Sequence, residues 1–173
     1  TRGRTWVART LSRSHEGISA WIRERHGQIL GREPTPDELA HWTSTVHDGG
    51  SLTGVVAALA GSAEAVVGAG GTDAGWVDQL YRTILERPAE PAAVAHWTGA
   101  VASGTPREVV VRYVWDSIES RRIRVRALYL EVLDRTAEPA GLAWHADRLA
   151  TIDDLALTAD LTGSHENFLL AQT

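Results

Sequence analysis

Residues 85–97 read LERPAEPAAVAHW, and this stretch has two relatives in the same chain. The relatives are LGREPTPDELAHW at residues 30–42 and LDRTAEPAGLAWH at residues 133–145. The intervals are 55 residues (85 minus 30) and 48 residues (133 minus 85). Recurrence at such a period is typical of proteins built from repeated structural units. A residue that every copy needs serves the packing of each unit, so the repeat argues against a single catalytic event.

Each copy of the repeat predicts three helices. In the second copy, apolar residues between Trp76 and Leu85 recur with the 3.6-residue period of a helix. The next helix begins at a proline in every copy, a residue whose fixed φ suits the first helical position: Pro36, Pro91 and Pro139. A capping box is expected at Thr35-Pro36-Asp37-Glu38, and another at Thr105-Pro106-Arg107-Glu108, where the third helix opens. The fold class is therefore all-α, with about three tandem three-helix units packed as a short solenoid or a compact helical bundle.

The repeat also sets the expected unit boundaries. Residues 1–16 align with the end of a repeat, so they are either the end of a preceding repeat or an N-terminal cap helix. Residues 17–68 form unit 1, residues 69–120 a glycine-rich loop plus unit 2, and residues 121–173 unit 3. The longer first interval comes from residues 68–73, which we expect to form a loop and the main hinge.

Composition excludes several classes of function. The 173-residue chain is 43% hydrophobic and 23% charged, which is ordinary for a globular protein, and no apolar run is long enough for a transmembrane segment. It has no Cys, so disulfides, thiolate zinc sites and cysteine nucleophiles are excluded. The net charge of −5 argues against a nucleic-acid partner. The arginine-rich run at residues 121–126 predicts a solvated helix with acidic neighbours, with a phosphate-binding patch as the alternative.

An arginine near the end of the first helix recurs in all three copies as Arg32, Arg87 and Arg135. A glutamate recurs as Glu16, Glu64, Glu119 and Glu166. Because a guanidinium matches a carboxylate at two points, we predict ion pairs between the two sets; presentation of the arginines to an anionic ligand is the alternative. A serine stands two residues before each glutamate, and we expect it to bond to local backbone near the end of the third helix.

Tryptophan and histidine accompany the repeat. His41-Trp42 and His96-Trp97 are equivalent, and the third copy has the exchanged order Trp144-His145. We expect these indoles to anchor the core, with stacking on a sugar or a partner surface as the alternative. Trp6 and Trp115 are predicted to be core or inter-unit contacts, and Trp21 matches Trp76, with Arg124 at their position in the third copy. The histidine spacings fit no metal site, so neither a metal nor a cofactor is expected.

The motifs together resemble a known family. Leu30-Gly31-Arg32-Glu33-Pro34 is followed by Leu39, Trp42, a glycine turn and Ser62-x-Glu64, and the later copies add Leu80-Tyr81 and Leu128-Tyr129. This pattern is similar to the bacterial family named domain of unknown function 4214, which is distantly similar to the linker domains of phycobilisomes. The resemblance implies a helical, non-catalytic protein that is exported or associated with the cell surface. It carries no established catalytic residues.

We therefore expect a non-catalytic helical repeat module that mediates protein–protein or surface-polymer interaction in an exported or surface-associated bacterial protein. The alternative is a carbohydrate-binding module that uses clusters of Trp, His and Arg. The candidate binding residues are those of the repeat: Arg32, His41, Trp42, Arg87, His96, Trp97, Arg135, Trp144 and His145. The expected location is secreted or cell-surface, with the cytoplasm as the alternative. Function is expected where the copies differ, at residues 25–27, at residues 68–73 and at the Trp144-His145 exchange.

Overall fold

The computed structural model describes residues 13–164 of the chain. Within this range it contains ten helices and no strand, which confirms the all-α prediction. The helices are α2 (His15–Leu30), α3 (Pro36–His47), α4 (Leu52–Ala60), α5 (Ala63–Gly68), α6 (Asp73–Leu85), α7 (Pro91–Ala102), α8 (Arg107–Trp115), α9 (Ile118–Leu133), α10 (Pro139–Arg148) and α11 (Asp154–Thr162). Trp6, Glu166 and most of the predicted cap helix at residues 1–16 lie outside the described residues. None of the helices between residues 13 and 164 combines the length and apolar character needed to cross a bilayer.

The predicted proline starts are confirmed, because α3, α7 and α10 each begin at their proline. The capping box of α3 is also present: the Glu38 backbone N–H donates to Thr35 Oγ1 at 3.3 Å, and the Thr35 N–H donates to the Glu38 carboxylate at 2.8 Å. The capping box predicted at Thr105 is wrong. Helix α8 starts one residue later than expected, so Pro106 is its N-cap and offers no side-chain hydrogen bond.

The repeated serine lies at the start of a helix and not at the end of one. Ser14, Ser62 and Ser117 are the N-caps of α2, α5 and α9, and each Oγ accepts a backbone N–H at 3.1–3.2 Å. The prediction that this serine lies near the end of the third helix is therefore corrected. An N-cap leaves the following glutamate in the first helical turn, where a negative charge suits the helix dipole.

The glycine-rich insertion splits one helix into two. Helices α2 and α9 follow their capping serines without a break and are 16 residues long. After Ser62 the corresponding helix stops as α5 and resumes as α6. Gly70 and Gly71, which lie between them, have φ of 92° and 75°, a left-handed conformation that glycine adopts without steric cost. The predicted loop is thus confirmed, and it divides the first helix of the second copy from its serine cap.

The first two copies share one hydrophobic core. Helix α2 contacts α3, α4 and α5, and α6 contacts α7, α8 and α9 in the same pattern. The equivalent helices α4 and α8 pack against each other, so the two copies face one another instead of stacking in one direction. This arrangement is the compact bundle rather than the solenoid. The fully buried core residues include Ile22, Val56, Val77, Val110 and Val111, and burying such a side chain contributes roughly 1.5–3 kcal/mol.

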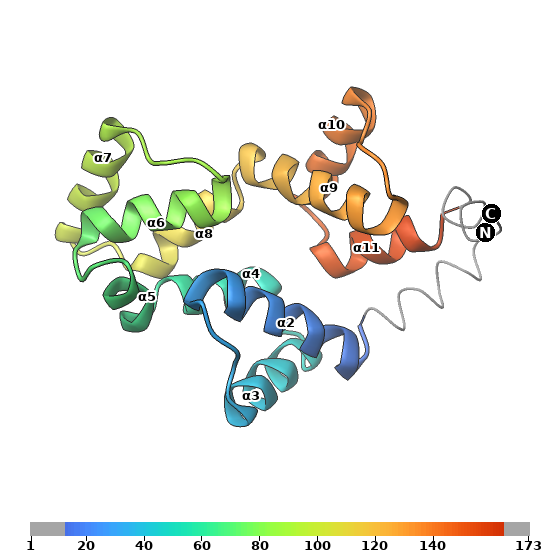
Figure 1. Ribbon diagram of the computed structural model, residues 1–173, viewed down its shortest axis with the longest axis horizontal. Helices are drawn as coiled ribbons and strands as arrows, with labels where there is room; N and C mark the ends of the chain where they lie inside the picture. Colours follow the sequence, from blue (N-terminus) through green and yellow to red (C-terminus); the bar gives the residue numbers. More distant parts are fainter. Residues whose placement is uncertain (1–12, 165–173) are drawn as a thin grey trace.

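The third copy has a smaller core of its own. Helix α9 packs against α10 and α11, and the three helices lie together on one side of the molecule (Figure 1). Its core is built from Val125, Leu128, Tyr129, Leu133, Ala146, Leu149, Leu157 and Leu161. A buried ion pair between Arg124 and Asp154, with Nη1 and Oδ1 2.5 Å apart, joins α9 to α11. The arginine-rich run therefore serves packing in part, because Arg121 also donates to the Ala146 carbonyl oxygen at 3.0 Å.

Candidate functional site

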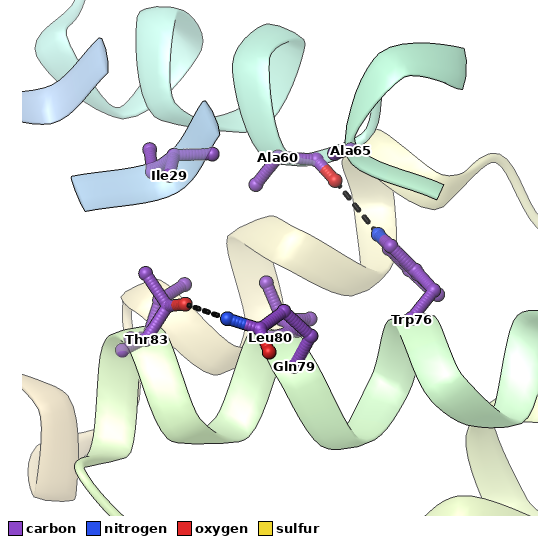
Figure 2. A pocket seen from close by; sticks show the side chains of 8 residues that line it. Ile29, Ala60, Ala65, Trp76, Gln79, Leu80 and Thr83 are labelled. Carbon is purple, nitrogen blue, oxygen red and sulfur yellow. Dashed lines mark hydrogen bonds between the residues drawn. The ribbon is translucent and has the colours of Figure 1, made fainter. Parts of the chain in front are cut away.

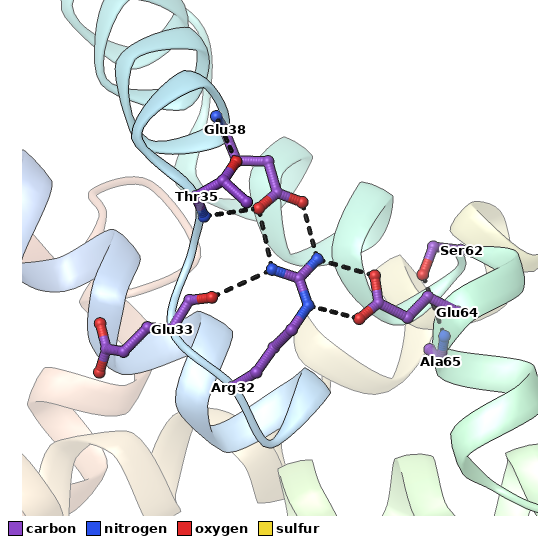
Figure 3. Close-up of polar contacts among 7 residues, drawn as sticks. All are labelled: Arg32, Glu33, Thr35, Glu38, Ser62, Glu64 and Ala65. Atoms are coloured by element: carbon purple, nitrogen blue, oxygen red, sulfur yellow. Dashed lines mark hydrogen bonds and ion pairs between the residues drawn. The ribbon is translucent and has the colours of Figure 1, made fainter.

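Arg32 lies just after Gly31, the C-cap of α2, and its guanidinium connects this end of α2 to α3 and α5. Its Nε and Nη2 donate to the Glu64 carboxylate at 2.6 and 2.8 Å. Its Nη1 and Nη2 donate to the Glu38 carboxylate at 2.9 and 2.7 Å, and Nη1 also donates to the Glu33 carbonyl oxygen at 3.0 Å (Figure 3). These contacts use all five N–H donors of the side chain. The predicted ion pair is confirmed, and Arg32 has no donor left for an anionic ligand.

The charges in this cluster stabilise one another. Hydrogen bonds from Arg32 hold the pKa of the Glu38 and Glu64 carboxyl groups below their ordinary values. Hydrogen bonds to Glu38 and then to Glu64 raise the pKa of Arg32. Two carboxylates share one guanidinium, so the cluster carries a net charge of about −1 at neutral pH.

The second copy repeats the ion pair. Arg87 Nε and Nη2 donate to the Glu119 carboxylate at 2.6 and 3.0 Å, and the two residues are separated by 32 positions, as are Arg32 and Glu64. Hydrogen bonding to Arg87 lowers the pKa of Glu119. In the third copy Arg135 donates to the Thr136 carbonyl oxygen at 2.9 Å, and its expected partner Glu166 lies outside the described residues. The recurring arginine is therefore a structural residue in the two copies where both partners are described.

The histidine and tryptophan of the first two copies face different environments. His41 and His96 are exposed, and the indoles of Trp42 and Trp97 are half-buried. Each histidine ring meets its neighbouring indole edge-on, with centroids 4.7 and 4.6 Å apart. Neither histidine is in the core, and both indoles keep part of their surface in contact with solvent.

The exchange in the third copy moves an indole to the surface. Trp144 takes the exposed position of the pair and is 58% exposed, with the Arg148 guanidinium 4.7 Å from its ring centroid. His145 takes the inward position and packs edge-on against Tyr129 at a centroid distance of 5.5 Å. Burial lowers the pKa of His145. The fold thus fixes which position faces outward, and the exchange decides which side chain occupies it.

Trp97 in the second copy is covered by a tyrosine. Its Nε1 donates to the Tyr81 hydroxyl at 3.0 Å, and the Tyr113 ring lies over it with centroids 5.8 Å apart and planes tilted by 33°. Tyr113 itself is 67% exposed. The residue that corresponds to Tyr113 in the first copy is Ala58 (113 minus 55). Nothing of similar size can therefore cover Trp42 from that position.

The first copy consequently has an open depression beside Trp42, which we call the first-repeat groove. It lies between the end of α2, the outer face of α3 and the junction of α4 with α5. It is lined by Leu30, Asp37, Glu38, His41, Trp42, Ala58, Leu59, Ser62 and Glu64. Trp42 and three acidic residues thus line one surface site.

The excess negative charge of the groove comes from residues that the other two copies lack. Asp37 is exposed, and with Glu38, Glu64 and Arg32 it gives the site a net charge of about −2. The positions of Asp37 and Glu38 are held by Ala92 and Ala93 in the second copy and by Ala140 and Gly141 in the third. The charge therefore belongs to this copy and not to the repeat.

Sequence reasoning found part of this groove. His41 and Trp42 line it, and Arg32 anchors two of its carboxylates. The other predicted binding residues lie on the second and third copies and do not reach it: Arg87, His96, Trp97, Arg135, Trp144 and His145. Asp37, Glu38 and Ala58 were outside the prediction. These three positions could have been found by aligning the copies position by position, because the first copy differs there from the other two.

Beneath the Arg32 cluster lies a buried histidine. His26 is 0% exposed, and neither of its ring nitrogens has a hydrogen-bond partner. Burial lowers its pKa, and nearby Glu38 opposes that shift. Tyr81 and Tyr129 hold the equivalent position in the other copies (26 plus 55, and 81 plus 48). Residues 25–27 were predicted to matter for function because they differ from the other copies. At His26 this difference lies in the hydrophobic core and not on the surface.

Two other pockets lack such an arrangement. One lies between α2, the α4–α5 junction and α6; Trp76 Nε1 donates to the Ala60 carbonyl oxygen there at 2.7 Å, and no charged side chain lines it (Figure 2). The other lies between α2, α6 and α9, and its two cations already have partners, Arg124 with Asp154 and Arg25 with Glu24. Within residues 13–164, no three His, Asp or Glu side chains are grouped to hold a metal ion.

The helices and their recurring contacts define an all-α protein built from repeated helical units. Residues 65–124 match the family described as domain of unknown function (DUF4214), which confirms for this segment the membership indicated by the sequence motifs. The matched segment runs from α5 into α9 and contains the Arg87–Glu119 pair and Trp97. Searches of curated proteins and of solved structures found no significant match.

Proposed function

We propose that this chain is a non-catalytic helical repeat module that binds a protein or a cell-surface polymer, and that the first-repeat groove is its contact site. The observation that carries the proposal is that the half-buried Trp42 and three acidic residues line one open depression. Indoles and carboxylates are side chains that bind partners when they stay accessible to solvent. A secreted or surface location is part of the proposal and rests on the family resemblance.

The contacts of the repeated residues support a non-catalytic role. Ser62 and Ser117 act as helix caps, and Arg32 and Arg87 are engaged by glutamates. A nucleophilic serine would need a neighbouring base and an oxyanion site. The repeated motif therefore has a structural use that accounts for its residues without catalysis.

The exposed aromatic residues favour carbohydrate recognition as the second candidate. Trp144 is 58% exposed and lies beside Arg148, and Trp42 is open because Ala58 stands where the second copy has Tyr113. An accessible indole offers a flat apolar face to a sugar ring. Trp21, Trp76 and Trp115 are at most 6% exposed and take no part in this candidate site.

Glycan and peptide arrays test the proposal directly. We expect the purified chain to bind on one of the two arrays, and Trp42→Ala to abolish that signal while circular dichroism shows an unchanged helical content. Trp97→Ala is the matched control, because Tyr113 lies over part of its indole and alanines replace the two acids of α3 in its copy, so it should contribute little. Binding that survives Trp42→Ala, no binding on either array, or shortened glycans in the mass spectrum of the recovered ligand would contradict the proposal.

A further inference from the structure

We propose that the first-repeat groove recognises amino sugars, namely sugar units that carry a protonated amine, within a polysaccharide. This inference rests on the proposed function and adds the chemical class of the ligand. It follows from three properties of the groove: its charge, its aromatic wall and the way it differs from the same place in the other copies.

The charge of the groove selects a cation. Asp37, Glu38 and Glu64 supply three carboxylates, and Arg32 supplies one guanidinium whose five donors are already used by Glu38, Glu64 and the Glu33 carbonyl oxygen. No lysine or further arginine lines the site. An anionic ligand would meet uncompensated negative charge, while an ammonium group would find it complementary.

The aromatic side chains of the groove favour a ligand in which the cation is attached to a ring. Trp42 presents part of its indole to the groove, and His41 meets that indole edge-on at a centroid distance of 4.7 Å. The face of an indole attracts both an ammonium group and the apolar face of a sugar ring. Carboxylate oxygens accept hydrogen bonds from sugar hydroxyls as well as from an ammonium group. An amino sugar therefore uses every kind of group that the groove offers.

In the other copies, different residues at the equivalent positions remove the features of the groove. In the second copy Tyr113 lies over Trp97, and Ala92 and Ala93 replace the two acids of α3. In the third copy Ala140 and Gly141 replace the same acids. These residues supply matched substitutions that the fold already accommodates at equivalent positions, so the groove can be altered with little risk to folding.

Two tetrasaccharides that differ only in charge provide the test. The first is a tetramer of glucosamine with free amines, and the second is the same tetramer with every amine acetylated. By isothermal titration calorimetry at about pH 6 and low salt, we expect the free-amine tetramer to bind roughly tenfold or more tightly than the acetylated one. Raising the NaCl concentration to about 0.5 M should reduce this preference, because salt screens exposed charges.

Three variants locate the site. Ala58→Tyr should abolish binding by covering Trp42, as Tyr113 covers Trp97. Asp37→Asn removes one exposed charge and should weaken binding of the free-amine tetramer roughly fivefold while leaving the acetylated tetramer unaffected. Tyr113→Ala is the control: it uncovers Trp97 in a copy without the acids and should leave the charge preference unchanged. Asp37 is exposed, so its variant remains informative even if Ala58→Tyr does not fold.

Each other outcome overturns the inference in an identifiable way. Equal affinity for the two tetramers, with loss of both in Trp42→Ala, removes the amine preference but leaves the proposed binding function standing. A free-amine preference that persists in Asp37→Asn and Ala58→Tyr places the site elsewhere. Binding of tetralysine without binding of either sugar makes a basic peptide the ligand instead. Absence of Trp42-dependent binding to sugars and to arrayed peptides contradicts the proposed function itself.

Discussion

At the scale of single residues, His26 is the clearest departure from the repeat. In the second copy Tyr81 accepts a hydrogen bond from Trp97 Nε1, and a histidine at the same place cannot offer a hydroxyl to Trp42. His26 instead buries both ring nitrogens without partners. An unsatisfied buried polar atom costs roughly 1–3 kcal/mol, so this exchange lowers stability in the helix beneath the groove.

We expect the free energy of unfolding to fall between about pH 7.5 and about pH 5.5. Burial lowers the pKa of His26 and His145 below 6.5 in the folded state, so the unfolded chain takes up protons first as the pH decreases. Each histidine that remains neutral contributes at most about 1.4 kcal/mol of loss at one pH unit below its unfolded pKa. His26→Tyr should remove about half of the loss in guanidinium denaturation curves. Substitution of the exposed His41 by tyrosine should leave the pH dependence of stability unchanged. If His26→Tyr also leaves it unchanged, this account is wrong.

At the scale of helices, a serine cap separates two consecutive helices at the junction of the second and third copies. Ser117 Oγ accepts the Ser120 N–H at 3.2 Å and also donates to the Val114 carbonyl oxygen at 2.7 Å, so one side chain ends α8 and starts α9. Helix α8 ends at Trp115 and α9 begins at Ile118, so the second copy runs almost directly into the third. Where the glycine loop intervenes, the capped turn survives separately as α5.

Ser117→Ala is expected to destabilise the protein by about 1 kcal/mol or slightly more, because the cap and the bond to Val114 are both lost. Ser117→Thr keeps a hydroxyl that can make both bonds and should retain most of the stability. Chemical denaturation followed by tryptophan fluorescence measures both variants. If the alanine variant is as stable as the threonine variant, the serine is not an energetically important cap.

At the scale of the whole molecule, two cores are joined through a few buried contacts. Trp115 at the end of α8 lies against the Arg124 guanidinium at 4.1 Å, and Arg124 pairs with Asp154 of α11. Trp21 and Trp76 hold the position of Arg124 in the first two copies. Burial lowers the pKa of Arg124, and Asp154 opposes that shift. The third copy thus uses a charged contact where the others use an indole.

Arg124→Met should destabilise the protein by about 3 kcal/mol, because it leaves the Asp154 carboxyl group buried without its partner. Adding Asp154→Leu should restore more than half of that loss, since an apolar pair of similar volume removes the unpaired charge. Arg126→Met on the exposed side of α9 is the control. Equilibrium denaturation gives the three values, and a double variant no more stable than Arg124→Met contradicts the buried-pair explanation.

Local chemistry made much of the fold and part of the groove predictable. Pro36, Pro91 and Pro139 begin their helices because a fixed φ and a missing N–H are local properties. The Arg32–Glu64 pair followed from a repeated charge of each sign. The contribution of Glu38 to the same guanidinium, and the space left by Ala58, depend on where α3 and α4 lie relative to α2, which no local pattern contains.

Local sequence was enough to predict the helices, the period and the Arg–Glu pairs of the first two copies, because propensity, capping and ion pairing act over a few residues or recur between copies. The tertiary structure alone decided that α4 packs on α8, that Trp144 is exposed while His145 is buried, and that Trp42 borders an open acidic groove. The last two features arise from differences between the copies, and the packing of neighbouring helices turns such differences into open or covered surface.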